Sequence, residues 1–507
     1  MTNGGPSNQA VGSVTFIDSS FTNTPVAFKI SRSMMSAPPT GGSLSVENIA
    51  LTNTPVAVQY GPDGTVYLAG TTGSMTIPAW KTGNFYNPTG PTTRQLGWTP
   101  PTRPASLLSS GNKYYERSKP QYNALPMTSF VSVRSGGAKG DGVTDDTLAL
   151  QTVINAAAAA GNVVFVDAGT YKVTKTLLIP KGSKLVGESY SVIMSSGNYF
   201  SNVNSPQVVV QVGNAGDTGV VEWSDMIIST QGPQAGAILI KWNLASSSWS
   251  PSGMWDVHTR IGGFKGSQLQ LAQCPTTPSS IAVNNNCLAA YMSMHISKSA
   301  FALYMENVWL WTADHDVDDP NLTQLDIYTG RGLLIESTAG TFWLVGIAVE
   351  HHEKYQYQLS GTTNLFMGQI QTEAPYYQPN PKAGTPYPTN TTLNDPDFGT
   401  SCPAGSPANC ALAWGLRVSA STNVFVYGAG LYSFFNNYST SCSAAGSATK
   451  CQNTIFTYDS AASKAIYVYN LNTVGTTGMV YRDTTQLAKY SDNVNNFPDT
   501  IVLFRSA

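Results

Sequence analysis

The stretch Gly-Ala-Lys-Gly-Asp-Gly-Val-Thr-Asp-Asp-Thr, residues 137–147, leads directly into the clearest helical pattern of this chain. Thr144 or Asp145 can cap a helix at this point, and acidic residues suit its first turn. Apolar residues then recur with helical spacing, at Leu150, Val153, Ile154 and Ala157. Gly161 is typical of a helix end. The pattern predicts an amphipathic helix over about residues 145–160.

Short runs of Val, Ile and Leu follow this helix, and turns rich in Asn, Gly and Ser separate many of them. The runs lie at 163–166, 177–179, 185–186, 208–212, 226–228, 237–240, 333–335 and 343–349. Many short strands without further amphipathic helices exclude a doubly wound α/β fold and an α/β barrel. A sandwich, a propeller and a β-helix remain. Irregular spacing, Asn-rich turns and a single helix favour an all-β parallel β-helix, in which that helix caps the N-terminal end.

The residues before this region divide into two parts. Residues 1–79 consist of short β segments, and the phrase Thr-Asn-Thr-Pro-Val-Ala occurs at 22–27 and again 30 residues later at 52–57. A repeat of that period is typical of a solenoid. Residues 80–125 are dense in Pro, Gly, Thr and Arg and lack apolar periodicity, which predicts a linker. The main β-helix is then predicted over residues 126–507.

The chain is poor in charge. Its 507 residues hold 27 Lys and Arg against 29 Asp and Glu, a net charge of −2, and only 11% of residues are charged. No basic run is present, so nucleic acid and anionic membranes are poor candidates as partners. The longest apolar runs are far shorter than the roughly 20 residues that a membrane-spanning helix needs. We expect a monomer.

The six cysteines form three close pairs in loop-like sequence. Pairing of neighbours, the simplest connectivity, predicts the disulfides Cys274–Cys287, Cys402–Cys410 and Cys442–Cys451. Three sequons are candidate sites of N-glycosylation, at Asn321, Asn390 and Asn437. Cysteine pairs and sequons together favour a secreted, extracellular protein. The residues after Met1 do not form a secretion signal, which implies that the natural N-terminus is absent or that the chain was expressed without it.

Two glutamates stand in aromatic-rich segments of this acid-poor chain. Glu350 lies in Ala-Val-Glu-His-His, residues 348–352, and Glu373 lies in Gln-Thr-Glu-Ala-Pro-Tyr-Tyr, residues 371–377. They are 23 residues apart, about one coil of a β-helix, so adjacent coils would bring both onto one face. Paired carboxylates can run acid–base chemistry on a glycosidic bond. The alternative is two ordinary solvated acids, which is the usual position of Glu.

A pair of tryptophans precedes the first glutamate. Trp309 and Trp311 are two residues apart on a predicted strand, so they share one face and Leu310 points the other way. They are either core aromatics of one coil or a platform for a sugar ring, and we choose Trp311 as the platform. Asp316 is a candidate for binding sugar hydroxyls, although a turn-capping Asp fits the pattern almost as well.

The motifs that suggest metal binding are incomplete. The acidic run at 314–318 begins like a calcium loop, but the twelfth position is Leu325 where that loop needs Glu. His352 begins like a zinc-protease motif, but Gln356 replaces the second His. We therefore predict no metal and no cofactor.

Two phrases resemble the opening of the pectate-lyase-like superfamily of right-handed parallel β-helices. They are residues 137–147 and Asp-Ala-Gly-Thr-Tyr at 167–171. Three later phrases, at 306–316, 349–357 and 371–377, resemble glycoside hydrolase family 55, the exo-acting β-1,3-glucanases or laminarinases. This second resemblance covers almost the whole chain.

The laminarinase resemblance implies two tandem β-helices joined by a long linker. The chain would then hold the last coils of an incomplete first β-helix over residues 1–79, the linker, and the complete second β-helix. It also implies exo-acting hydrolysis of β-1,3-glucan with inversion, releasing glucose or short oligosaccharides. By motif match Glu373 is the general acid, and Glu350 binds or activates the water.

We assign Gln371, Tyr376 and His352, which lie in the same phrases, to substrate binding. Two other functions stay open. One is a non-catalytic glucan-binding or structural β-helix, because most of the first β-helix has no counterpart. The other, less favoured, is a polysaccharide lyase of the same superfamily. Such lyases commonly need calcium and a basic side chain, and no basic cluster accompanies the two glutamates.

Overall fold

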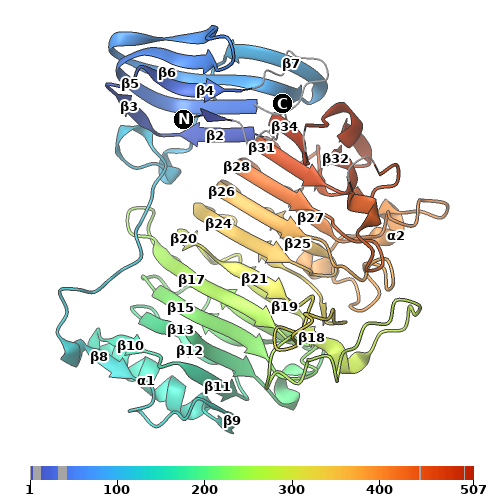
Figure 1. Ribbon diagram of the computed structural model, residues 1–507. Coiled ribbons are helices and arrows are strands. Elements are labelled where there is room, and N and C mark those ends of the chain that lie inside the picture. The colour runs from blue at the N-terminus through green and yellow to red at the C-terminus, as the bar shows by residue number, and fades with distance from the viewer. Residues whose placement is uncertain (1, 4–12, 32–42, 445–446, 496, 507) are drawn as a thin grey trace.

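The computed structural model describes residues 2–3, 13–31, 43–444, 447–495 and 497–506, and it is nearly all β-structure (Figure 1). Two α-helices lie in this part of the chain, α1 (Thr147–Ala160) and the short α2 (Phe398–Ser401). Neither is long and apolar enough to cross a membrane, and the same holds for every other helix of the described residues.

Two long parallel sheets make up the main body. The first contains β13 (Lys184–Ser195), β15 (Glu222–Thr230), β17 (Ser252–Ile261), β20 (Leu303–Glu306), β21 (Trp309–Thr312), β24 (Phe342–Glu350), β26 (Thr363–Glu373), β28 (Thr422–Tyr432) and β31 (Lys464–Val474). The second contains β12 (Leu177–Ile179), β14 (Gln207–Val212), β16 (Ala237–Trp242), β19 (Met292–Ile296), β23 (Leu333–Ile335), β25 (Tyr355–Ser360), β27 (Trp414–Ser419), β30 (Phe456–Tyr458) and β32 (Thr476–Arg482).

The chain alternates between these two sheets along its length. Each strand pairs in parallel with the strand one coil earlier, as β24 does with β20 and β21, and β25 with β23. This order is that of a β-helix, in agreement with the predicted all-β class. The apolar side chains of both sheets point inward and form one continuous core along the coils.

Most strands of the first sheet bend at one residue with a left-handed backbone. These residues include Asp225, Asp256, Asn307 and Gly346, with φ between 52° and 62°. Gly, Asn and Asp adopt this conformation most easily. The bend divides each coil into flat segments, so one strand contributes to two faces of the solenoid.

The predicted helix is present as α1. It ends at Gly161, whose φ is 72°, and the four residues of its predicted apolar face, Leu150, Val153, Ile154 and Ala157, are all buried. The helix packs on three short strands, β10 (Val163–Phe165), β11 (Gly169–Val173) and β12, at the start of the solenoid. Two further short strands pair with them, β8 (Phe130–Ser132) and β9 (Asp141–Asp145).

The N-terminal residues form a layer of their own. Its strands are β2 (Ser13–Ile17), β3 (Ser20–Thr22), β4 (Val26–Ile30), β5 (Ser43–Tyr60), β6 (Val66–Asn87) and β7 (Thr89–Gly97). Strands β2, β3 and β4 all pair in parallel with β5 at a constant offset of 30 residues, as in Ser13 with Ser43. The duplicated phrase is therefore a structural repeat. Residues 1, 4–12 and 32–42 of the predicted N-terminal region lie outside the described residues.

The linker prediction is wrong for residues 80–97. Strand β6 runs antiparallel to β5 as far as Asn87, and β7 runs antiparallel to β6. Pro88, Gly90 and Pro91 lie around the turn between β6 and β7, whereas Gly83 lies inside β6 and pairs with β7. The abundant Thr residues suit an extended backbone.

The N-terminal layer and the end of the solenoid belong to one sheet. The last strand, β34 (Asp499–Arg505), pairs antiparallel with β31 on one side and in parallel with β6 on the other. Figure 1 shows this layer stacked on the C-terminal end of the solenoid. The remaining strands are β1 (Thr2–Asn3), β18 (Leu288–Ala290), β22 (Tyr328–Thr329), β29 (Gln452–Thr454) and β33 (Thr485–Lys489).

Residues 98–129, which we call the strap, connect the N-terminal layer to the opposite end of the solenoid. They run along its outside from the top of Figure 1 to the region of α1. Leu107 and Tyr114 of the strap pack on an aromatic cluster of the first sheet that includes Trp343 and Phe366. The strap therefore covers the outer face formed by the first halves of these strands.

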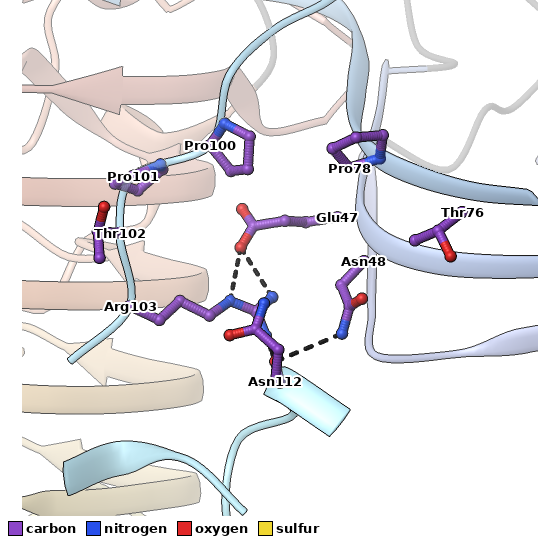
Figure 2. A pocket seen from close by; sticks show the side chains of 9 residues that line it. All are labelled: Glu47, Asn48, Thr76, Pro78, Pro100, Pro101, Thr102, Arg103 and Asn112. Atoms are coloured by element: carbon purple, nitrogen blue, oxygen red, sulfur yellow. Dashed lines mark hydrogen bonds and ion pairs between the residues drawn. The ribbon is translucent and has the colours of Figure 1, made fainter. Parts of the chain in front are cut away.

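A buried ion-pair network joins the strap to both bodies (Figure 2). The Arg103 guanidinium of the strap lies 2.7 Å from Glu47 of the N-terminal layer, the contact that Figure 2 draws, and 2.7 Å from Asp18 of the same layer. Glu47 also accepts hydrogen bonds from the hydroxyls of Tyr427 and Tyr469, at 3.0 and 2.8 Å, on β28 and β31. One carboxylate thus connects the N-terminal layer, the strap and the solenoid.

The six cysteines form the three predicted disulfides, Cys274–Cys287, Cys402–Cys410 and Cys442–Cys451. Each closes a short loop between strands. The neighbour-pairing prediction is confirmed.

Candidate active site

Glu350 and Glu373 lie side by side on the outer face of the first sheet. They are direct partners in the parallel pairing of β24 with β26, so their Cα atoms are about 4.8 Å apart. The same row continues to Trp311 of β21 on one side and Tyr432 of β28 on the other. Ile347 and Val349 alternate with the outer residues and point into the core. The predicted meeting of the two glutamates on one face is observed.

Glu350 is the more enclosed of the two acids. It is only 8% exposed, and its Oε2 accepts a hydrogen bond of 2.9 Å from the indole nitrogen of Trp309. Burial raises the pKa of Glu350 above its ordinary value, and the charge of Glu373 adds to the effect. A carboxylate of raised pKa is a stronger base than an exposed one.

Glu373 is held by two neighbours. Its side chain is 25% exposed, its Oε1 accepts from the amide of Gln371 at 3.3 Å, and its Oε2 lies 3.4 Å from Nε2 of His351. The other ring nitrogen of His351 lies 2.8 Å from the carbonyl oxygen of Thr312. Glu373 therefore has a fixed direction and an oxygen that remains partly accessible.

The order of the two tryptophans differs from the prediction. Both lie on the outer face, as their spacing predicts, and their rings stack with centroids 4.9 Å apart. Trp309 is 38% exposed, whereas Trp311 is only 4% exposed, with the ring of His315 on it. Trp311 thus cannot be the open platform. The exposed ring beside Glu350 belongs to Trp309.

Three other predicted binding residues are buried in structural roles. Asp316 accepts hydrogen bonds from the Gln270 amide and the backbone of Leu271, so it organises a loop, which was the alternative reading. His352 is bound by Ser293 and Gln356 inside the solenoid. Both residues follow the end of a strand, β21 for Asp316 and β24 for His352, where strand alternation no longer orders the side chains.

Tyr376 is also inaccessible. It is 0% exposed, and its hydroxyl donates to the carbonyl oxygen of Leu325. Its ring stands edge-on against His351, with centroids 5.6 Å apart. Tyr376 therefore supports a residue of the site from below and does not contact solvent. Gln371 alone, of the predicted binding residues, lies on the accessible outer face between the two acids.

Sequence reasoning missed His351, Trp309 and Tyr432 as members of the site. His351 is 2% exposed beneath Glu373, and its pKa is raised to about 9, because the bond to Glu373 and nearby carboxylates outweigh the cost of burial. Tyr432 lies opposite Glu373 in the pairing of β26 with β28, and burial raises its pKa. Its place in the row requires the strand register, which no local sequence signal supplies.

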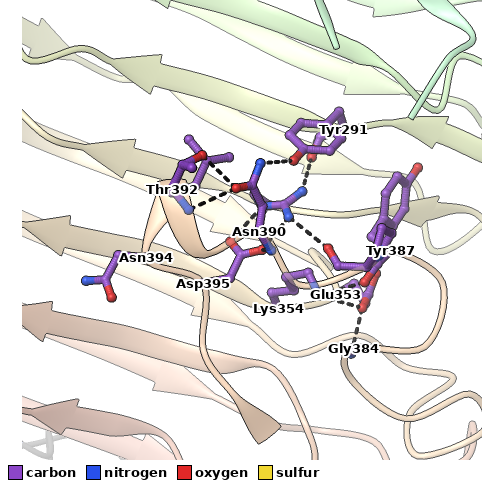
Figure 3. Close-up of polar contacts among 12 residues, drawn as sticks. Tyr291, Glu353, Lys354, Gly384, Tyr387, Asn390, Thr392, Asn394 and Asp395 are labelled. Carbon is purple, nitrogen blue, oxygen red and sulfur yellow. Dashed lines mark hydrogen bonds and ion pairs between the residues drawn. The ribbon is translucent and has the colours of Figure 1, made fainter. Parts of the chain in front are cut away.

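A second polar cluster lies behind the site, in the interior (Figure 3). Glu353 accepts from the backbone of Gly384, and Lys354 donates to the carbonyl oxygen of Tyr387 at 2.7 Å. Arg331 forms a two-point ion pair with Asp395. These buried charges fasten the long loop between β26 and β27 to the coil that carries Glu350. Burial raises the pKa of Glu353 to about 7.

A cavity of about 340 Å³ lies elsewhere, at the joint of the strap with the N-terminal layer. Glu47, Arg103 and three prolines line it, as Figure 2 shows. None of its lining residues belongs to the strands that carry the two glutamates, so it is not part of the site.

The three sequons differ in their surroundings. Asn321 is exposed on a loop. The amide nitrogens of Asn390 and Asn437 donate to the Tyr291 hydroxyl and the Pro278 carbonyl. A glycan on either of these two would replace a hydrogen bond of the fold, so Asn321 is the better candidate.

The chain is similar to known proteins along nearly all of its length. The family profile of rhamnogalacturonase A/epimerase, pectate lyase-like, matches residues 130–249. A glucan 1,3-beta-glucosidase of Cochliobolus carbonum is 43% identical over 507 residues, covering 99% of this chain and 62% of that protein. A probable glucan endo-1,3-beta-glucosidase of Arthroderma benhamiae is 44% identical over 405 residues, covering 80% of this chain and 45% of that protein.

Among solved structures, sacteLam55A from Streptomyces sp. SirexAA-E aligns with 98% of this chain and 74% of its own, at 14% identity and a TM-score of 0.41. The chain spans about three fifths of the length of the Cochliobolus relative and less than half of the Arthroderma relative. With 43% identity across nearly every residue, the chain is a homologue of a fungal glucan 1,3-β-glucosidase.

Proposed function

We propose that this protein hydrolyses β-1,3-glucan through Glu350 and Glu373. The observation that carries the proposal is their direct pairing across β24 and β26, on an outer face with an exposed tryptophan. Two acids flanking a bond are the requirement for glycoside hydrolysis, and an aromatic face suits a sugar ring. The homology to a glucan 1,3-beta-glucosidase supports the choice of substrate.

The roles of the two acids follow the motif match. Glu373, partly exposed and directed by His351 and Gln371, protonates the glycosidic oxygen. Glu350, more enclosed and of raised pKa, takes a proton from the attacking water. Trp309 donates to Glu350 and offers the open part of its ring to the sugar.

The reaction is exo-acting and inverts the anomeric carbon. Glucose and short oligosaccharides released from laminarin are the expected products, with the α-anomer appearing first by NMR. A β-anomer would reject inversion, and internal cleavage without early glucose would reject the exo mode. Glu373→Gln and Glu350→Gln are the matched variants. If both variants keep full glucan hydrolysis, the proposal is rejected.

The second candidate function is glucan binding without catalysis. It is favoured by one observation, that the chain spans only 62% of the length of its Cochliobolus relative. Binding to laminarin without sugar release would establish it. Unsaturated products from pectate that depend on calcium would instead indicate a lyase.

We also propose the hand of the coils, the role of α1 and of the N-terminal layer, and the location and oligomeric state of the protein. The coils are right-handed, α1 caps the first of them, and the N-terminal layer is the end of a preceding β-helix whose repeat is the 30-residue offset seen in β2–β5. Three disulfides and fungal homologues support an extracellular enzyme. We expect it to act as a monomer. Secretion assays test the first statement and sedimentation tests the second.

A further inference from the structure

His351 has one ring nitrogen that must carry a hydrogen. Its Nδ1 lies 2.8 Å from the carbonyl oxygen of Thr312, and a carbonyl oxygen can only accept. Its Nε2 lies 3.4 Å from Oε2 of Glu373. Nε2 is therefore the atom that gains or loses a proton, and it faces the acid. Hydrogen bonds of catalytic groups are often this long before substrate binds.

The position of this ring is imposed by the structure around it. His351 has a left-handed backbone, with φ of 67°, and its backbone nitrogen donates to the carbonyl oxygen of Glu373 at 3.0 Å. Tyr376 stands edge-on against the ring. Left-handed residues are common at the bends of this chain, so the conformation itself does not mark a site. At this position it brings the His351 side chain beneath Glu373.

The charges that face His351 are negative. Asp314, Glu350 and Glu373 all act on the ring, and the adjacent His352 stays neutral because burial lowers its pKa to about 3. Burial opposes a charge on His351, but these carboxylates outweigh it and set its pKa at about 9. A proton is thus available beside Glu373 throughout the neutral range.

We propose that His351 and Glu373 share one proton and form the acid of this site together, with His351 as the positioning residue. The inference rests on the proposed hydrolysis. An ordinary glutamate is ionised at neutral pH. Because Nε2 faces Oε2, a proton held by the ring can pass to the oxygen of Glu373 that meets the glycosidic bond.

The protons balance over the reaction. Glu373 gives the shared proton to the glycosidic oxygen, whose bond to the anomeric carbon breaks with its electron pair on oxygen. The pair is left as a carboxylate and a neutral ring that keeps its hydrogen on Nδ1. Water bonds to the anomeric carbon and loses one proton to Glu350. Exchange with solvent then removes that proton from Glu350 and returns one proton to the pair.

The first test is an NMR titration of the imidazole nitrogens in the full chain, with His351→Gln used to assign the signal. We expect Nδ1 to stay protonated and Nε2 to titrate near 9, far above the ordinary 6.5. In Glu373→Gln the midpoint should fall by about one pH unit or more. His295→Asn, which removes another buried histidine with a carboxylate partner, should leave it unchanged. A midpoint at or below 6.5, or one that Glu373→Gln does not move, would overturn the inference.

The second test is the pH profile of laminarin hydrolysis. In His351→Gln the amide can still donate to Glu373 but cannot ionise. We expect kcat/KM at neutral pH to fall about ten-fold or more, and the basic limb to move to lower pH while KM changes little. A purely structural role would lower activity at all pH values without moving that limb.

In the NMR test, Glu373→Gln replaces a partly exposed side chain, so its result does not depend on repacking of the interior.

The two levels of failure are separable. If the native chain releases no sugar from laminarin, the proposed function fails, while the titration still decides whether the pair shares a proton. If laminarin is hydrolysed but the basic limb stays in place in His351→Gln, the shared proton is rejected and the function stands.

Discussion

Glu350 and Glu373 are the same amino acid in two different settings. Glu350 receives the indole hydrogen of Trp309 and is nearly enclosed, whereas Glu373 remains a quarter exposed above His351. Burial disfavours the charged form of a carboxyl, and a fixed donor partly restores it. The two acids therefore differ in environment although they are adjacent in the sheet.

At the residue scale, the first prediction concerns the two variants of the acids. Glu373→Gln should reduce laminarin hydrolysis by about 10²–10⁴, the usual contribution of general acid–base groups. An aryl glucoside with a good leaving group needs less protonation and should be partly spared. Glu350→Gln should harm both substrates alike, because water attack is common to both. Equal damage to both substrates in both variants would contradict these roles.

The second prediction is the pH dependence of activity. Glu350 must be ionised to accept a proton, and its pKa is raised by burial, so activity should rise through a midpoint above 4.5. The shared proton is lost as His351 titrates at about 9, so activity should fall there. The profile of kcat/KM against pH measures both limbs. An acid limb at or below the ordinary value for glutamate would remove Glu350 as the base.

The third prediction tests the hydrogen bond to Glu350. Trp309→Phe keeps an aromatic ring but removes the donor, which stabilises the ionised form. A bond to a charged group is worth about 1.5 kcal/mol, so the acid limb should move up by about one pH unit. Trp311→Phe is the matched control, because Trp311 neighbours Glu350 in the strand pairing but the indole hydrogen bond to Glu350 comes from Trp309, and it should leave the limb in place. The same shift in both variants would argue against the bond.

At the scale of elements, strand alternation decides which side chains reach the solvent. In β24 and β26 the inner residues Ile347, Val349 and Ile370 fill the core, and Glu350 and Glu373 point outward. A slip of one residue in either strand would bury a glutamate and expose a core residue. The apolar residues that point into the core therefore hold the two acids in register on the outer face.

The loop after β26 depends on a carboxyl that is buried. Glu353 accepts from Gly384, and its pKa is raised from 4.5 to about 7 by burial. The folded chain thus holds this proton more tightly than the unfolded chain, so its contribution to stability is present below about pH 4.5 and is lost as pH rises through 7.

The fourth prediction follows for Glu353→Gln. The amide oxygen can keep the bond to Gly384, and the carboxyl that titrates is removed, while Lys354, 3.5 Å from it, stays buried and keeps its bond to Tyr387. The free energy of unfolding should therefore depend less on pH between 5 and 8, by on the order of 1–3 kcal/mol. Urea unfolding at both pH values measures the difference. An unchanged pH dependence would show that Glu353 does not titrate in this range.

At the scale of the whole molecule, three parts meet at one carboxylate. Glu47 of the N-terminal layer binds Arg103 of the strap and two tyrosines of the solenoid. Both members of the ion pair are nearly inaccessible, with side chains 2–3% exposed. Removal of one partner from a buried pair leaves the other charge uncompensated, which is far more costly than the loss of a surface pair.

The fifth prediction is that Arg103→Met destabilises the chain by about 3–5 kcal/mol, or separates unfolding into two transitions as the N-terminal layer detaches. Lys119→Met is the control, because Lys119 also pairs with two acids of the solenoid but is 32% exposed, and it should cost less than about 1 kcal/mol. Calorimetry distinguishes the outcomes. Equal effects of the two substitutions would show that the buried Arg103–Glu47 pair stabilises the chain no more than an exposed ion pair does.

Much of the architecture was predictable because it depends on local patterns. The amphipathic face of α1, its end at Gly161, the 30-residue repeat and the three disulfides each follow from spacing within a short segment. The pairing of Glu350 with Glu373 follows from a separation of one coil. The boundary of the linker could not be predicted in this way, because a Thr-rich edge strand and an extended linker have similar composition.

The sequence by itself therefore determined the coil, the face on which Glu350 and Glu373 stand, and the partners of the cysteines, since strand alternation and short chain separations specify them. Only the tertiary structure decided which neighbours are open to solvent. Trp309 is exposed and Trp311 covered, and His351 reaches Glu373 whereas His352 turns inside, although each pair is close in sequence. Burial and contact at the end of a strand are set by the coils above and below, which the local sequence does not encode.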